Sequence, residues 1–158
     1  MKKLIIIALL FLPIGLSAQQ QSEVQFGTAY DEAMIELKAE YGEPTSQDDN
    51  QAVFSSKAYQ HGGMTFNEVK CKFKNQKLVE KRFYKQARTK AVAVKNMMLL
   101  KKALEKEYSM SEDYEDDGTA FFTGGLSPTG IGRLFTICVM PRNGQWVTLL
   151  QYGPFRFN

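Results

Sequence analysis

Side chains that could do chemistry are few in this sequence, and their spacing favours binding over catalysis. His61 is the only histidine among 158 residues, and its setting, "QHGGM", is typical of a surface loop. A hydrolytic triad needs a histidine beside an activated serine or cysteine, and the chain has no G-x-S-x-G motif. Zinc sites use clusters of Cys and His, whereas this chain has only Cys71 and Cys138 besides the one histidine. We therefore expect no catalytic residue, no resident metal and no cofactor.

The segment "DYEDDG" has the beginning of a calcium-binding pattern. Asp113, Glu115 and Asp117 alternate before Gly118, as in the first half of an EF-hand loop. Position twelve of such a loop carries a bidentate glutamate, but here it is Gly124. The segment therefore predicts a solvated acidic turn.

Carboxylates leave one enzymatic alternative open. The chain has 17 Asp and Glu residues, and a glycosidase-type site needs two carboxyl groups at a set separation in space. Spacing along the sequence does not give that separation. A small secreted hydrolase is thus one alternative to a binding protein, and a homodimeric structural protein is the other.

The N-terminus has the three parts of a secretory signal peptide. Lys2 and Lys3 precede an apolar run over residues 4–16, and the small residues Ser17 and Ala18 form a cleavage site before Gln19. The run is shorter than the roughly 20 residues that span a bilayer. We expect residues 1–18 to be removed, and a periplasmic or extracellular protein without a permanent membrane anchor. Cleavage lowers the formal net charge from +3 to +1, so we expect no nucleic-acid partner.

Two segments of the chain resemble each other at an offset of sixty-eight residues. "DDNQAVF" (residues 48–54) returns as "DDGTAFF" (residues 116–122), and Asn75 in "KNQK" corresponds to Asn143 in "RNGQ". Asn favours the positive φ of tight hairpin turns. Apolar stripes at helical spacing precede both copies.

These landmarks predict an α+β fold, a tandem αβββ repeat whose helices pack on one face of an antiparallel sheet. Residues 19–87 form the first half and residues 88–158 the second, within one compact unit. The expected helices are 30–41 and 89–108, and the expected strands are 51–58, 64–74, 77–86, 119–124, 132–141 and 145–152.

The stretch "FGTAYDEAMIELKAEYGEP", residues 26–44, resembles a pattern found in BamE-like proteins and in the β-lactamase inhibitor protein fold. Its shared features are Phe-Gly, a small hydroxyl residue, an acidic pair, a helix and Gly-x-Pro. The resemblance implies tandem halves whose curved sheet clasps a partner. It assigns no binding residue to this chain.

Alternation along the expected strands assigns residues to two sheet faces. The face expected to lie under the helices consists of Val69, Cys71, Phe73, Ile137, Val139 and Pro141. Cys138 should point to the opposite face, away from Cys71. This difference favours two unpaired cysteines. We expect the open face of the second half to carry an apolar patch of Leu134, Met140, Trp146, Leu150 and Tyr152. Such patches mark interaction sites. The occupant could be a protein partner, an apolar ligand, a second copy of the chain, or the chain's own termini.

The run "RTKAVAVKNMMLLKK", residues 88–102, mixes apolar residues with four lysines and an arginine. As a helix it is amphipathic, and packing on the core is the favoured interpretation. A contact with a membrane surface or an acidic glycan is the alternative.

Overall fold

The computed structural model describes residues 24–158, which form two helices and ten strands. The predicted signal peptide, 1–18, lies outside the described residues. The helices are α1 (Tyr30–Tyr41) and α2 (Lys90–Leu104), and the strands are β1 (Ser46–Asp48), β2 (Gln51–Phe54), β3 (Tyr59–His61), β4 (Met64–Phe66), β5 (Glu68–Lys74), β6 (Lys77–Ala87), β7 (Met110–Tyr114), β8 (Ala120–Leu126), β9 (Arg133–Arg142) and β10 (Gln145–Tyr152).

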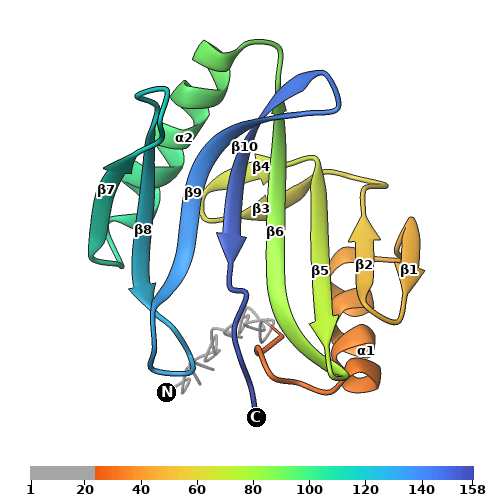
Figure 1. Cartoon of the computed structure of the whole chain (residues 1–158). Helices are drawn as coiled ribbons and strands as arrows, with labels where there is room; N and C mark the ends of the chain where they lie inside the picture. Colours follow the sequence, from red (N-terminus) through yellow and green to blue (C-terminus); the bar gives the residue numbers. More distant parts are fainter. Residues whose placement is uncertain (1–23) are drawn as a thin grey trace, which may run out of the picture.

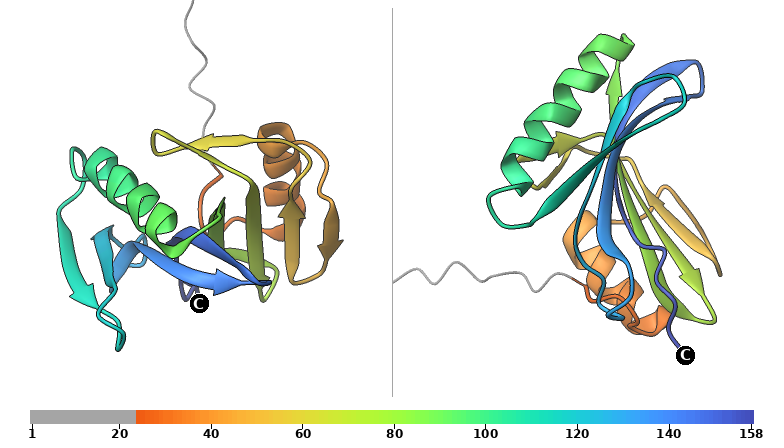
Figure 2. Two further views of the ribbon diagram at one scale, coloured as in Figure 1. Left: turned by 90° about the horizontal axis from the view of Figure 1, so that it is seen from above. Right: turned by 60° about the vertical axis from the view of Figure 1, so that its left-hand side comes forward.

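Eight of the strands form one antiparallel sheet in the order β1-β2-β5-β6-β10-β9-β8-β7. Strands β3 and β4 form a separate hairpin. Both helices and this hairpin lie on the same side of the curved sheet, and the other side is open (Figures 1 and 2). The α+β class and the antiparallel sheet are thus as predicted.

Local sequence signals mark the end of α1 and the start of α2. Helix α1 ends at Gly42, which has φ 88° and whose N–H donates to the Lys38 carbonyl at 2.9 Å. Thr89 caps α2, because its hydroxyl accepts from the Val92 N–H at 3.2 Å. Helix α2 ends at Leu104, four residues earlier than predicted, where the chain enters a turn.

The expected count of three strands per half was wrong, because each half supplies four strands to the sheet. Strands β1 and β7 lie at the two edges and are almost entirely solvent-exposed, so they lack the apolar alternation that indicates a strand. The acidic residues of the two similar segments, 48–54 and 116–122, lie at the β1–β2 and β7–β8 turns.

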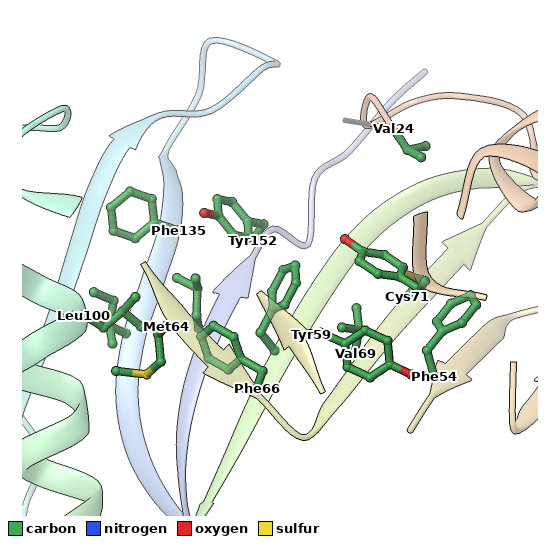
Figure 3. Packing of buried hydrophobic residues seen from close by; sticks show 14 of the residues in the cluster. Val24, Phe54, Tyr59, Met64, Phe66, Val69, Cys71, Leu100, Phe135 and Tyr152 are labelled. Atoms are coloured by element: carbon green, nitrogen blue, oxygen red, sulfur yellow. The ribbon is translucent and has the colours of Figure 1, made fainter. Parts of the chain in front are cut away.

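The expected strand 64–74 is split at Asn67. Asn67 donates its N–H to the Tyr84 carbonyl at 2.9 Å, and its side chain accepts from the Gln86 N–H at 2.8 Å. Residues before this point leave the main sheet and pair with β3 instead. The resulting β3–β4 hairpin lies beside α2 on the helix side of the sheet (Figure 2), and its residues Phe66, Tyr59 and Met64 join the core (Figure 3).

One continuous apolar core joins the two halves on the helix side of the sheet. It includes Leu37 and Phe54 from the first half and Leu100 and Ile137 from the second. Phe155 of the C-terminal tail packs into the same core, with its ring centroid 4.7 Å from that of Phe26. The tail therefore closes the helix side and leaves the opposite face uncovered.

Candidate functional site

The five residues predicted to share an open patch lie in different places. Leu150 and Tyr152 are buried in the core on the helix side, and Trp146 is half-buried against the same core. Met140 lies on the opposite, open face, and Leu134 lies at the end of β9 beside the core. The prediction that these side chains share one exposed surface was therefore wrong.

A β-bulge in the first half explains the error. In that half, Lys72 pairs with Glu80 and Phe73 with Leu78, so Val79 is an extra residue on β6. Strands β9 and β10 have no such bulge, and Met140 pairs with Val147. Transferring face assignments from β6 to β10 at a fixed offset therefore put the β10 side chains on the wrong face.

The open face exposes little apolar surface. Tyr84, Val147 and Leu149 form a small cluster there, and all three are buried. The Arg142 guanidinium lies 4.0 Å from the centroid of the Tyr84 ring, and its Nη2 donates to Glu68 at 2.8 Å. The Arg142 side chain thus covers part of this cluster, and Met140 is an exposed large apolar side chain on this face.

Both cysteines are free thiols on opposite faces of the sheet, as the alternation predicted. Burial raises the pKa of Cys71 to about 12, although nearby Lys81 acts in the other direction. Burial also raises the pKa of Cys138, to about 11. Neither environment resembles that of an activated thiolate.

A pocket of about 770 Å³ lies on the helix side of the sheet. It is bounded by the segment before α1, the tip of the β3–β4 hairpin, the C-terminal end of α2, and the β8–β9 connection. Its lining residues are Val24, Gln25, Phe26, His61, Gly62, Gly63, Ala103, Leu104, Lys106, Glu107, Tyr108, Leu126, Pro128, Leu134 and Tyr152. Leu134 and Tyr152, from the predicted patch, meet here.

The hairpin tip positions His61 in the pocket wall. Gly62 and Gly63 have φ of 54° and 75°, which closes a two-residue turn and pairs His61 with Met64. A Cβ on Gly62 would lie 3.2 Å from Leu100 of α2, so glycine lets the tip approach the helix. The interpretation of His61 as a surface-loop residue was therefore wrong.

His61 makes two specific contacts with the core. Its ring stacks on Phe83, with centroids 4.3 Å apart and an interplanar angle of 9°. Its Nε2 lies 2.8 Å from the Tyr152 hydroxyl, at hydrogen-bond distance. The pair adds polar atoms to a lining that also contains Gln25, Lys106 and Glu107 among its apolar residues.

Three aromatic rings, those of Phe26, Tyr108 and Tyr152, line the pocket, and Phe135 packs against two of them. The Tyr152 ring lies 6.3 Å from Phe26 and 5.8 Å from Phe135, centroid to centroid. Tyr108 packs against Phe135 at 5.3 Å. Figure 3 shows Phe135 and Tyr152 side by side on the sheet. These contacts fix the rings, so the wall is preformed.

The rim of the pocket is unusually apolar for an exposed segment. Leu126, which lines the pocket, is 82% exposed, and Ile131 in the adjoining connection is 84% exposed. Glu107 is the one carboxylate among the described residues that line the pocket. A pocket of this size with a few polar groups has the features of a small-molecule site.

Within residues 24–158, no helix has the length and apolar composition needed to cross a membrane. No group of three or more His, Cys, Asp or Glu side chains in that range is arranged to hold a metal ion. Comparison of the chain with protein-family models, curated proteins and solved structures finds no match. The resemblance of residues 26–44 to the BamE-like and β-lactamase inhibitor folds stays a prediction.

Sequence reasoning missed most of the pocket because its walls come from distant parts of the chain. Val24, His61, Tyr108 and Tyr152 are spread across the described sequence. The available signal was the "HGG" tripeptide, since two successive glycines between extended residues indicate a tight hairpin. A tight hairpin would have fixed the direction of His61.

Proposed function

We propose that this chain is an exported, non-catalytic binding protein that takes an apolar small molecule into the pocket between α2, the β3–β4 hairpin and β10. The observation that carries the proposal is the pocket itself, about 770 Å³ with Phe26, Leu104 and Leu134 among its lining residues. Ligand sites are typically about 300–1,000 Å³ and predominantly apolar. Export rests on the predicted signal peptide.

The pocket is a better binding site than the open sheet face. A ligand gains free energy from apolar area that it removes from water. On the open face, Tyr84, Val147 and Leu149 are already buried, so a partner would gain little there. In the pocket, the apolar lining and the exposed Leu126 remain available.

The hydrolase alternative has weaker support. Glycoside cleavage uses two carboxyl groups, and Glu107 alone provides one among the described lining residues. His61 is held by a ring stack and by Tyr152, and the described lining has no serine or cysteine that it could activate. These contacts favour recognition of a ligand over its conversion.

Filling the pocket tests the proposal. Ala103 lines it from α2, and Ala103→Trp would place an indole in the cavity. We expect this variant to bind the neutral fluorescent probe N-phenyl-1-naphthylamine at least about tenfold more weakly than the parent, a difference of about 1.4 kcal/mol. Fluorescence titration with a fixed protein concentration measures it.

Ala91→Trp is the matched control, since Ala91 is exposed on the same helix and is not among the pocket residues. We expect it to bind the probe like the parent. Equal affinity of the parent and Ala103→Trp would contradict the proposal. So would an equal loss in both variants, because the probe would then sit elsewhere on α2.

We also infer that the two halves are copies of one ancestral unit. In support, each half supplies four neighbouring strands to the sheet, and the last strands of the two halves, β6 and β10, pair at the centre of the sheet. The equivalent turns use positive φ at Asn75 and Gln76 and at Asn143 and Gly144. The β3–β4 hairpin would then be an insertion into the first copy.

A further inference from the structure

Helix α2 has a second face that the core does not use. Its inner face, formed by Ala93, Met97, Leu100 and Leu104, is buried. The opposite face, which we call the α2 outer face, consists of exposed residues: Lys95, Met98, Leu99, Lys102 and Lys106. Their spacing of three, four and seven residues places them on one side of the helix, the last just beyond its end.

Two apolar side chains lie among the lysines of this face. Met98 is 46% exposed and Leu99 is 54% exposed. Neither packs against the core clusters of the described chain. Exposed apolar residues are ordinary when single, but here they adjoin each other between Lys95 and Lys102.

The charge of the α2 outer face is not neutralised within the described chain. Lys101 pairs with Glu105, and Lys90 pairs with Asp117 at 2.7 Å. The ion pairs of residues 24–158 include none with Lys95, Lys102 or Lys106. The face therefore presents three positive charges around an apolar centre.

We propose that the α2 outer face docks on the surface of an anionic lipid bilayer. A helix of this kind lies in the interface plane, with its apolar side chains in the headgroup and acyl boundary and its lysines on anionic headgroups. An acidic polymer would satisfy the lysines and leave Met98 and Leu99 in water. Lipid satisfies both kinds of side chain at once.

Two features orient the docked molecule. The acidic β7–β8 turn lies beside the N-terminal end of α2, because Asp117 pairs with Lys90. Its negative charge disfavours contact of that end with anionic lipid, so we expect the contact over the stretch from Lys95 to Lys106. Lys106 also lines the pocket. Docking through this face therefore brings the pocket close to the bilayer. The inference does not depend on the pocket having a ligand.

Vesicle sedimentation tests this proposal on the chain from Gln19 onward, since an attached signal peptide would bind lipid by itself. We expect the protein to sediment with phosphatidylglycerol–phosphatidylcholine vesicles and to stay in solution with phosphatidylcholine alone. Lys95→Glu with Lys102→Glu should lower the partition coefficient at least about tenfold, because each lysine near an anionic surface contributes to binding. Met98→Ser with Leu99→Ser should lower it by a similar factor.

The control pair, Lys57→Glu with Lys74→Glu, makes the same change in net charge at exposed sites outside α2. We expect its binding to stay within about twofold of the parent. An equal loss in this control would show attraction by net charge alone and overturn the proposal. Undiminished binding of the serine variant would also overturn it, in favour of an acidic polymer. Circular dichroism checks that each variant, changed only at exposed positions, is folded.

Discussion

The two thiols lie in environments that suppress ionisation, which links their burial to the alkaline stability of the protein. Burial raises the pKa of Cys71 from 9.0 to about 12. Above pH 9 the unfolded chain therefore loses a proton that the folded chain keeps. The free energy of unfolding falls as pH rises wherever the unfolded state binds fewer protons.

We predict that Cys71→Ala loses less stability than the parent on going from about pH 8 to about pH 10.5. The difference should be about 2 kcal/mol, because the variant has no thiol to ionise in its unfolded state. Urea denaturation of both proteins at each pH measures it. The cavity left by Ala adds a constant cost, so only the change with pH is diagnostic.

Thiol labelling provides an independent check on the same residue. Cys71 should react with an aromatic disulfide reagent only as fast as the protein opens, since a buried, protonated thiol is a poor nucleophile. Cys138 is less buried and should react sooner. Rapid labelling of native Cys71 would contradict the burial that raises its pKa.

At the scale of elements, the two central hairpins have equivalent turns with different residues. Gln76 and Gly144 both adopt positive φ, 58° and 75°. A non-glycine residue pays a steric cost of about 1–2 kcal/mol in this conformation. Apart from Gly144 itself and its two chain neighbours, no residue of the described chain comes within 4 Å of a Cβ added there, so exchange at this position changes mainly backbone strain.

We predict opposite effects for the two exchanges. Gln76→Gly should stabilise the protein by about 0.5 kcal/mol, because relief of strain is partly offset by the greater freedom of glycine in the unfolded chain. Gly144→Gln should destabilise it by about 1 kcal/mol. Thermal unfolding of the two variants and the parent measures both. Effects of the same sign would mean that the turns are not equivalent.

The sequence predicts those elements whose signal is local. The apolar stripe over residues 30–41 located α1, and Asn75 and Asn143 located the two turns. Strands β1 and β7 were missed because edge strands in water need no apolar face. The bulge at Val79 was missed too, because an extra residue becomes visible only when the partner strand is known.

The pocket was also missed from the sequence, because its lining residues are far apart in the chain. Tyr152 was recognised as a binding candidate, but the alternation argument assigned it to the open face. In the structure Tyr152 contacts His61, which is 91 residues away in the sequence, and Phe26, which is near the other end of the described chain. Contacts of that range depend on how the elements pack, which local periodicity does not encode.

At the scale of the whole molecule, the seam between β6 and β10 joins the halves. It runs over seven residue pairs, from Trp146 opposite Ala87 to Tyr152 opposite Lys81. Behind the seam, on the second-half side, the Thr148 hydroxyl of β10 donates to the Ala93 carbonyl of α2 at 2.8 Å, in a fully buried position. A chain cut after Ala87 would expose both seam strands and divide the core.

We predict that the fragments 19–87 and 88–158 do not fold separately but reassemble when mixed. Each fragment alone would have two exposed sheet edges and half of the apolar core, which is too little to offset the chain entropy. The mixture should regain the β6–β10 pairing and unfold in a single transition, followed by circular dichroism and by sedimentation of a one-to-one complex. A sharp transition in either fragment by itself would contradict the description of one core shared across the seam. If the halves descend from one unit, each fragment should also pair weakly with itself through its seam strand at high concentration. This self-pairing should be weaker than the mixed complex, because β6 and β10 have diverged in sequence and only β6 carries the bulge at Val79.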